Sequence, residues 1–105
     1  MGTADIHRTI DAVWRMESAK IIAVLARMLR DVGQAEELAQ DALVRALEKW
    51  PQDGVPDRPA AWLTTVAKRS AIDALRRRQM QERKHEEIGR DLEAGEAMAP
   101  PAEQP

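Results

Sequence analysis

The sequence predicts an all-α fold, a compact three-helix bundle followed by a disordered acidic tail. Apolar residues recur at three- and four-residue spacing over three long stretches, the period of amphipathic helices. Hydrophobic residues make up 44% of the 105 residues, whereas aromatic residues make up only 3% and are all Trp. Few β-branched runs interrupt this pattern. We therefore expect one small helical domain.

The composition excludes several classes of protein. The chain has no Cys, so disulfides and thiolate metal sites are excluded. His7 and His85 lack metal-ligand spacing, and no catalytic set or glycine-rich phosphate loop stands out, so we expect no cofactor, no metal and no enzymatic activity. No apolar leader or apolar stretch of about 18 residues is present, which argues against a membrane location and favours the cytoplasm.

The first amphipathic stretch predicts a helix from about residue 7 to residue 30, after a flexible leader over residues 1–7. Gly33 suits the left-handed position that follows a helix end. The predicted helical domain covers residues 8–88. The apolar positions near heptad spacing are Ile10, Val13, Trp14, Ile21, Leu25, Met28 and Val32.

The second stretch predicts a helix over residues 34–50 with two different faces. One face is rich in small apolar residues, and the other is acidic with Val44 at its centre. A lone exposed Val is commonly harmless surface, and the alternative is a docking surface for a basic or amphipathic partner helix. The expected core face is Ala35, Leu38, Ala39, Ala42, Leu43, Ala46, Leu47 and Trp50.

A loop over residues 51–59, with three Pro and one Gly, precedes the third predicted helix. Asp57 is a candidate cap, and Pro59 suits the first helical turn. This helix runs over residues 58–78 and is expected to extend for two or three further turns. Its outward face presents Thr65, Lys68, Arg69 and Arg76. Its expected buried face is Trp62, Leu63, Val66, Ala67, Ser70, Ala71 and Ala74.

Charge is unevenly distributed along the chain, whose formal net charge is −2. Residues 58–85 carry eight Lys or Arg against two acids, whereas residues 31–57 carry two Lys or Arg against seven acids. A polyanion responds to the local charge within about one Debye length, roughly 10 Å at 0.1 M salt. Residues 89–105 are acidic and end in Ala, Pro, Glu and Gln, which indicates a linker or disordered tail.

Two motifs at a fixed separation resemble a known family. They are AEELAQDALVRALEKWP and, after a Pro-containing loop, PAAWLTTVAKRSAIDALRRR. This pair resembles region 2 of bacterial RNA polymerase sigma factors of the extracytoplasmic-function (ECF) class. With the first helix, the resemblance covers roughly residues 8–80, and it implies a transcription initiation factor domain of the bacterial cytoplasm.

The resemblance implies two kinds of partner. The acidic helix is expected to dock on the clamp coiled coil of the largest (β′) polymerase subunit through Glu37, Gln40, Asp41, Val44, Arg45 and Glu48. The loop and the third helix are expected to recognise and melt the promoter −10 element, with a non-template base flipped into the loop. The implied DNA-binding residues are Gln52, Asp53, Asp57, Arg58, Thr65, Lys68, Arg69, Ile72, Arg76 and Arg77. An anti-sigma or other regulatory protein is a further partner of such domains.

The chain departs from the family pattern at one position and lacks a second domain. The family frequently has Asn where this chain has Arg69, and Arg can grip a phosphate or stack on a base but lacks the paired donor and acceptor of an amide. The helix-turn-helix domain, region 4, is absent from the sequence. We interpret the chain as an excised region 2, the alternative being a naturally truncated protein.

Two other functions fit the same residues. One is a helical protein–protein interaction module without DNA recognition, in which Arg76, Arg77 and Arg78 only solubilise a helix. The other is a helical bundle that binds RNA without sequence preference. Sequence-dependent binding to the non-template strand of a −10-like sequence would distinguish the transcription-initiation function from both of these alternatives.

Overall fold

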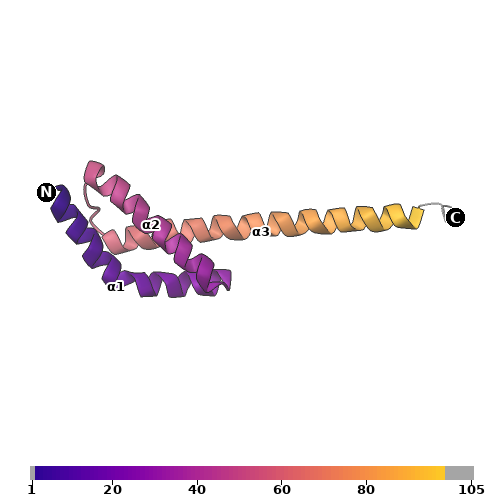
Figure 1. Cartoon of the computed structure of the whole chain (residues 1–105), viewed down its shortest axis with the longest axis horizontal. Coiled ribbons are helices and arrows are strands. Elements are labelled where there is room, and N and C mark those ends of the chain that lie inside the picture. The colour runs from indigo at the N-terminus through magenta and orange to yellow at the C-terminus, as the bar shows by residue number, and fades with distance from the viewer. Residues whose placement is uncertain (1, 99–105) are drawn as a thin grey trace. The chain divides into compact units, whose positions relative to one another are not determined.

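The computed structural model describes residues 2–98, which form three α-helices (Figure 1). They are α1 (Thr3–Leu29), α2 (Val32–Asp53) and α3 (Pro59–Met98). No strand occurs in this described range, and the predicted all-α class is confirmed. The contacts divide the chain into two units, Met1–Ala74 and Leu75–Pro105.

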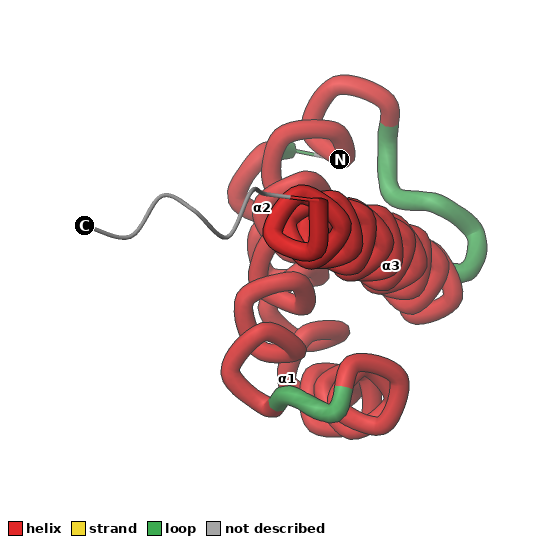
Figure 2. Tube along the Cα trace, turned by 90° about the vertical axis from the view of Figure 1, so that its right-hand side faces the viewer, coloured by secondary structure: helices red, strands yellow, loops and turns green. Residues whose placement is uncertain are grey.

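The hydrophobic core lies in the first unit and takes side chains from all three helices. In α2 the buried positions other than Trp50 are all Ala, at the spacing of one helix face, and such small residues let neighbouring backbones approach closely. Figure 2 shows the short connections between the helices. The buried core residues are Ile6, Ile10, Ile21, Leu25, Leu29, Ala35, Ala39, Ala42, Ala46, Trp50, Leu63, Ala67, Ala71 and Ala74.

Helix α1 begins earlier than the sequence predicted. The helix starts at Thr3, within the predicted flexible leader, and the Ile6 amide donates to the Gly2 carbonyl at 3.1 Å. Ile6 is only 5% exposed and lies one turn before the buried Ile10. Burying this extra apolar residue extends the amphipathic face, which explains why the leader is helical from Thr3.

The turn between α1 and α2 uses Arg30 where Gly33 was expected. Arg30 has the left-handed backbone conformation (φ 54°, ψ 37°), and its amide donates to the Ala26 carbonyl at 2.7 Å. Asp31 caps α2, since its carboxylate accepts from the Gln34 amide at 3.0 Å. This cap starts α2 at Val32, so Gly33 falls in the first helical turn and the prediction for Gly33 was wrong.

Helix α2 ends three residues later than predicted and shortens the loop. Pro51 lies inside its last turn, where it removes one backbone donor without preventing the turn. The Gly54 amide donates to the Trp50 carbonyl at 2.9 Å, and Gly54 has φ 90°, which ends the helix. The connection to α3 is therefore residues 54–58, not 51–59.

Helix α3 begins at Pro59, one residue after the predicted start at Arg58. The Trp62 amide donates to the Arg58 carbonyl at 3.0 Å, which places Arg58 at the cap position and Asp57 one residue before it. The helix continues to Met98, beyond residue 89, where a disordered tail was expected; the Ala, Glu, Arg and Leu content of this stretch favours helix over its two Gly. The rest of the predicted tail, residues 99–105, lies outside the described residues.

In the second unit, residues 75–98 belong to α3. Arg90 pairs with Glu86 one turn earlier, with 3.8 Å between guanidinium nitrogen and carboxylate oxygen. Met80, Ile88 and Leu92 are exposed on this segment. Within residues 2–98, no helix has the length and apolar character needed to cross a lipid bilayer.

Candidate functional site

The outer face of α2 presents all six residues predicted to bind a protein partner. Each of them is exposed, while the Ala residues of the opposite face are buried. Val44 is 49% exposed at the centre of this face. The docking face, as we name it, is Glu37, Gln40, Asp41, Val44, Arg45 and Glu48.

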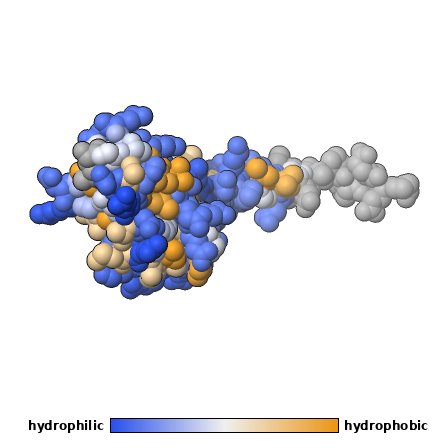
Figure 3. Space-filling view, turned by 60° about the vertical axis from the view of Figure 1, so that its left-hand side comes forward, coloured by the Kyte–Doolittle hydropathy of each residue, from blue (hydrophilic) through white to orange (hydrophobic). Residues whose placement is uncertain are grey.

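The composition of the docking face defines what could bind there. Its carboxylates outnumber its single cation, and an apolar side chain stands among them. A partner would need basic side chains around a small apolar contact. Figure 3 shows orange hydrophobic side chains between blue hydrophilic ones on the side of the molecule that it presents.

The outward face of α3 in the first unit presents the predicted nucleic-acid-binding residues. Thr65, Lys68, Arg69 and Ile72 are exposed, and they lie opposite the buried stripe of Leu63, Ala67, Ala71 and Ala74. Ile72 is 41% exposed. We name these four exposed residues the reading face. They combine cations, which can contact phosphates, with a hydroxyl and an apolar side chain, which can contact bases.

The remaining predicted cations of α3 lie in the second unit. Arg76 and Arg77 are exposed there. Arg77 and Arg78 each have an interaction partner in the structure, as does Asp73 in the first unit. The exposed cations of the second unit are therefore not all equally available to a ligand.

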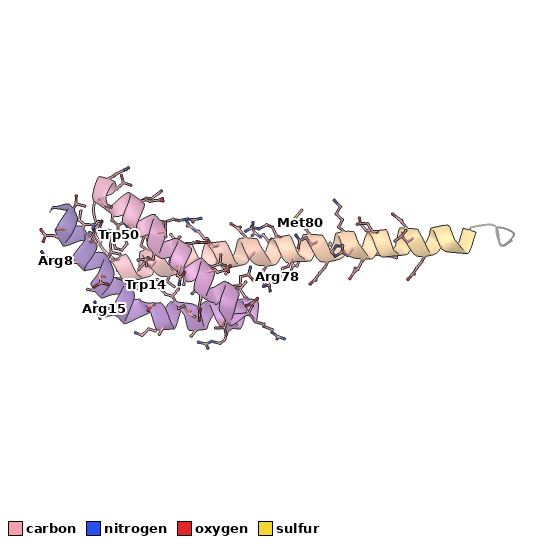
Figure 4. All side chains as sticks on the ribbon, in the orientation of Figure 1. Arg8, Trp14, Arg15, Trp50, Arg78 and Met80 are labelled. Carbon is pink, nitrogen blue, oxygen red and sulfur yellow. The ribbon has the colours of Figure 1, made fainter. Side chains whose placement is uncertain are left out.

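A cavity of about 310 Å³ lies beside the loop between α2 and α3. Two tryptophans contribute to it, Trp50 from α2 (Figure 4) and Trp62 from the first turn of α3, with ring centroids 5.3 Å apart and planes at 70°. Trp62 is half-buried, whereas the helical periodicity of the sequence predicted that it lies in the core. Its position in the first turn of α3, beside the short loop, leaves part of the indole uncovered.

The structure assigns the loop residues to two groups. Asp53, which was predicted to bind DNA from the loop, lines the cavity and belongs to the last turn of α2. Gln52, Asp57 and Arg58 are exposed but are not among the lining residues. The complete lining is Lys49, Trp50, Asp53, Gly54, Val55, Pro56 and Trp62.

The sequence predicted a loop over residues 52–58 that accepts a base, but not that Lys49 and the two tryptophans line a cavity beside it, although one signal was present. Two of the three Trp residues, Trp50 and Trp62, flank the Pro- and Gly-containing loop. A pair of aromatic residues at the two ends of a short loop can meet across it, and here they do. Lys49 carried no signal of its own, because its place in the cavity depends on where α2 ends.

A second, smaller cavity of about 160 Å³ lies between α1 and α2 and is mostly apolar. Trp14 and Leu47 are among its lining residues, and Leu47 is partly exposed although it was expected in the core. In the described part of the chain, no group of three or more His, Cys, Asp or Glu is placed to hold a metal ion. The lining residues are His7, Ile10, Asp11, Trp14, Leu43 and Leu47.

Comparison with known proteins identifies the family. Residues 13–81 match the Sigma-70 region 2 family, which covers more than half of the chain. The chain belongs to the Sigma-70 region 2 family. The matched range includes the docking face, the cavity and the reading face.

Several bacterial proteins are similar to this Sigma-70 region 2 chain. An uncharacterized protein of Rhizobium meliloti, R00370, is 46% identical over 56 residues, which are 53% of this chain and 13% of that protein. The probable ECF RNA polymerase sigma factor SigI of Mycobacterium tuberculosis is 31% identical over 70 residues, covering 67% of this chain and 23% of SigI. The ECF RNA polymerase sigma factor SigK of Mycobacterium ulcerans is 38% identical over 64 residues, covering 57% of this chain and 33% of SigK.

These comparisons confirm the resemblance to region 2 of ECF sigma factors. The chain spans between 13% and 33% of the lengths of the three relatives named. No solved structure matches the chain.

Proposed function

We propose that this Sigma-70 region 2 domain docks on RNA polymerase and recognises and melts the promoter −10 element. The observation that carries this proposal is the pairing of two different surfaces on one small helical unit within the family match. The acidic docking face of α2 suits a basic protein partner, and the reading face of α3 with the neighbouring cavity suits a DNA strand.

The docking face supplies the polymerase contact in this proposal. The clamp coiled coil of the β′ subunit is the partner implied by the family resemblance. Asp41 and Glu48 would pair with basic side chains, and Val44 would enter an apolar contact between them. Rim charges of this kind contribute more to association rate and specificity than to affinity, so we expect the binding to weaken with salt.

The reading face and the cavity supply the DNA contact. A non-template base extruded from the duplex would enter the cavity, whose volume of about 310 Å³ accommodates a small planar ligand. The half-buried Trp62 offers an aromatic surface there. Extruding a base costs a few kcal/mol, and stacking on an aromatic side chain returns about 1–3 kcal/mol per base.

A second candidate function is a protein–protein interaction module without DNA recognition. The observation that favours it is the apolar surface around α2, where Val44 and Leu47 are both exposed and Leu47 lines the smaller cavity. A regulatory protein could cover this surface. This function predicts protein binding with no affinity for DNA.

The polymerase contact is tested by measuring the affinity of the chain for the isolated β′ clamp coiled coil. We expect Asp41→Lys and Gln40→Ala to weaken binding by at least tenfold, because both change exposed residues of the docking face. Glu36→Lys is the matched control, since Glu36 is exposed on α2 but lies outside that face. Helicity of all three variants is checked by circular dichroism.

Two results would contradict the polymerase contact. One is a folded wild type that does not bind the coiled coil at all. The other is an equal loss of binding in Glu36→Lys and Asp41→Lys, which would indicate a nonspecific response to net charge.

A further inference from the structure

We propose that the second unit is a self-association surface, through which two copies of this chain pair as antiparallel helices. The helical part of this unit runs from Leu75 to Met98, about 36 Å of helix at 1.5 Å per residue. The inference does not depend on the proposed function, because it uses neither the docking face nor the reading face.

The helix of the second unit leaves its apolar residues in contact with solvent. From Leu75 to Gly95, every described side chain is exposed or half-buried, and none is buried. Ile88 is 46% exposed and Leu92 is 64% exposed. Helices in proteins owe most of their stability to the packing of an apolar face against another element. A helix that continues for this length without such packing therefore has a face available to a partner.

Four exposed residues share one side of this helix at alternating four- and three-residue spacing, by which helices pair side by side. The pairing seam, as we name it, is Gln81, His85, Ile88 and Leu92. Ile88 and Leu92 supply its apolar contacts, one turn apart. Met80 is also exposed, but it lies roughly a quarter of a turn away from the seam.

The charge of α3 reverses along the helix, and this reversal matches a second copy of the chain. Residues 73–84 carry five Lys or Arg against two acids, a net charge of +3, whereas residues 86–95 carry four acids against one Arg, a net charge of −3. These net values include the charges that pair within one stretch, such as Arg90 with Glu86. Antiparallel copies place each basic stretch beside an acidic one. Parallel copies would place like charges together, which repel.

An antiparallel pair also brings the two seams into one register. When the helices overlap from end to end over residues 75–98, Gln81 of one copy faces Leu92 of the second copy. In the same register His85 faces Ile88 of the second copy. The pair is two-fold symmetric, so each of these contacts occurs twice.

This register brings two opposite charges together beside the seam. Lys84 and Asp91 lie on the same edge of the helix, two turns apart. Lys84 of one copy is then next to Asp91 of the second copy, and Asp91 is next to Lys84. Charged residues that flank an apolar seam set the partner and the orientation of paired helices. A second copy therefore fits both the seam and its charges.

The orientation is tested with introduced cysteines, since the chain has no Cys of its own. Full chains carrying Gln81→Cys or Leu92→Cys are oxidised separately and as a mixture. We expect the mixture to form a disulfide-linked dimer and each variant alone to form little, because like positions are about 16 Å apart along an antiparallel pair. Disulfides in each variant alone, with none favoured in the mixture, would indicate parallel pairing and overturn the proposal.

Self-association is measured by sedimentation equilibrium of the full chain from about 5 to 500 μM. We expect the mass to rise with concentration from 11.8 kDa towards twice that value. Lys84→Asp and Asp91→Lys are each expected to weaken self-association about fivefold, and the double variant is expected to restore it, because the two charges are exchanged. A mass of 11.8 kDa at every concentration would overturn the proposal.

Ile88→Ser and Met80→Ser form the matched pair of variants for the seam. We expect Ile88→Ser to weaken self-association about tenfold and Met80→Ser to leave it unchanged, because only Ile88 belongs to the seam. Fluorescence of the three tryptophans, all in the first unit, verifies that the core is intact. Equal effects of the two variants would overturn the proposal. A monomeric chain whose Ile88→Ser variant binds core polymerase more weakly would also overturn it, by assigning the seam to the polymerase.

Discussion

At the scale of single residues, the Trp50–Trp62 pair links the core to the candidate DNA site. Trp50 is 1% exposed and meets Trp62 edge to face at 5.3 Å, while both rings line the loop cavity. The Trp50 indole Nε1 is buried and has no hydrogen-bond partner in the described structure. An unsatisfied buried donor costs about 1–3 kcal/mol. Trp50 thus combines a large packing gain with a polar cost.

This combination predicts different effects for two substitutions of Trp50. Trp50→Phe removes the unsatisfied donor together with part of the ring, so we expect it to lower the free energy of unfolding by less than about 1.5 kcal/mol. Trp50→Ala leaves a cavity and is expected to cost about 3–5 kcal/mol. Urea denaturation measures both values. An equal loss in the free energy of unfolding for the two variants would contradict the idea that the buried donor of Trp50 offsets part of its packing gain.

Backbone conformation predicts opposite effects at two other residues. Arg30 has φ 54°, which glycine adopts without steric cost, so Arg30→Gly is expected to stabilise the fold by about 0.5–1 kcal/mol. Gly54 has φ 90°, and a Cβ placed there meets no atom within 4 Å. Gly54→Ala is therefore expected to destabilise by about 1 kcal/mol through its backbone conformation alone. Thermal unfolding compares the two, and changes of the same sign would be inconsistent with this reasoning.

At the scale of elements, the sequence predicted the helices well and their ends less well. The spacing of Leu25, Ala39 and Leu63 with their neighbours predicted which faces are buried, because burial follows a period that the sequence displays. The ends depend on local competition. Asp31 capped α2 early, and Pro51 was tolerated in a last turn closed by Gly54. These two outcomes shortened the loop and formed a cavity that no single residue had predicted.

The two faces of α2 predict different responses to the same kind of change. Ala39 is fully buried within the Ala stripe, so Ala39→Leu overpacks the core and is expected to cost about 1–3 kcal/mol of folding free energy or more. Val44→Leu adds a methylene on the exposed docking face and is expected to change stability by less than about 0.5 kcal/mol. Chemical denaturation of both variants measures the contrast. Tolerance of Leu at position 39 would contradict close packing along this stripe.

At the scale of the whole molecule, opposite local charges on α2 and α3 explain how an acidic chain could bind DNA. Residues 58–85 carry an excess of Lys and Arg although the formal net charge of the chain is −2. Each phosphate contact with a single strand contributes about −0.7 to the slope of log affinity against log salt concentration. We expect Lys68→Gln to reduce this slope by about 0.7, measured by salt titration of single-stranded DNA binding in the polymerase complex. An unchanged slope would show that Lys68 does not contact a phosphate.

Promoter-strand recognition is tested most directly by measuring the affinity of core RNA polymerase for the non-template strand of a −10-like sequence and for its complement. Each strand is measured with and without this chain. We expect the chain to raise the affinity for the non-template strand by at least tenfold and to leave the affinity for the complement nearly unchanged. We also expect Asp41→Lys to abolish the gain, since the chain must dock before it can present α3 to DNA. An equal gain for both strands, or a gain that survives Asp41→Lys, would contradict the proposal that α2 docks the domain so that α3 can recognise the promoter strand.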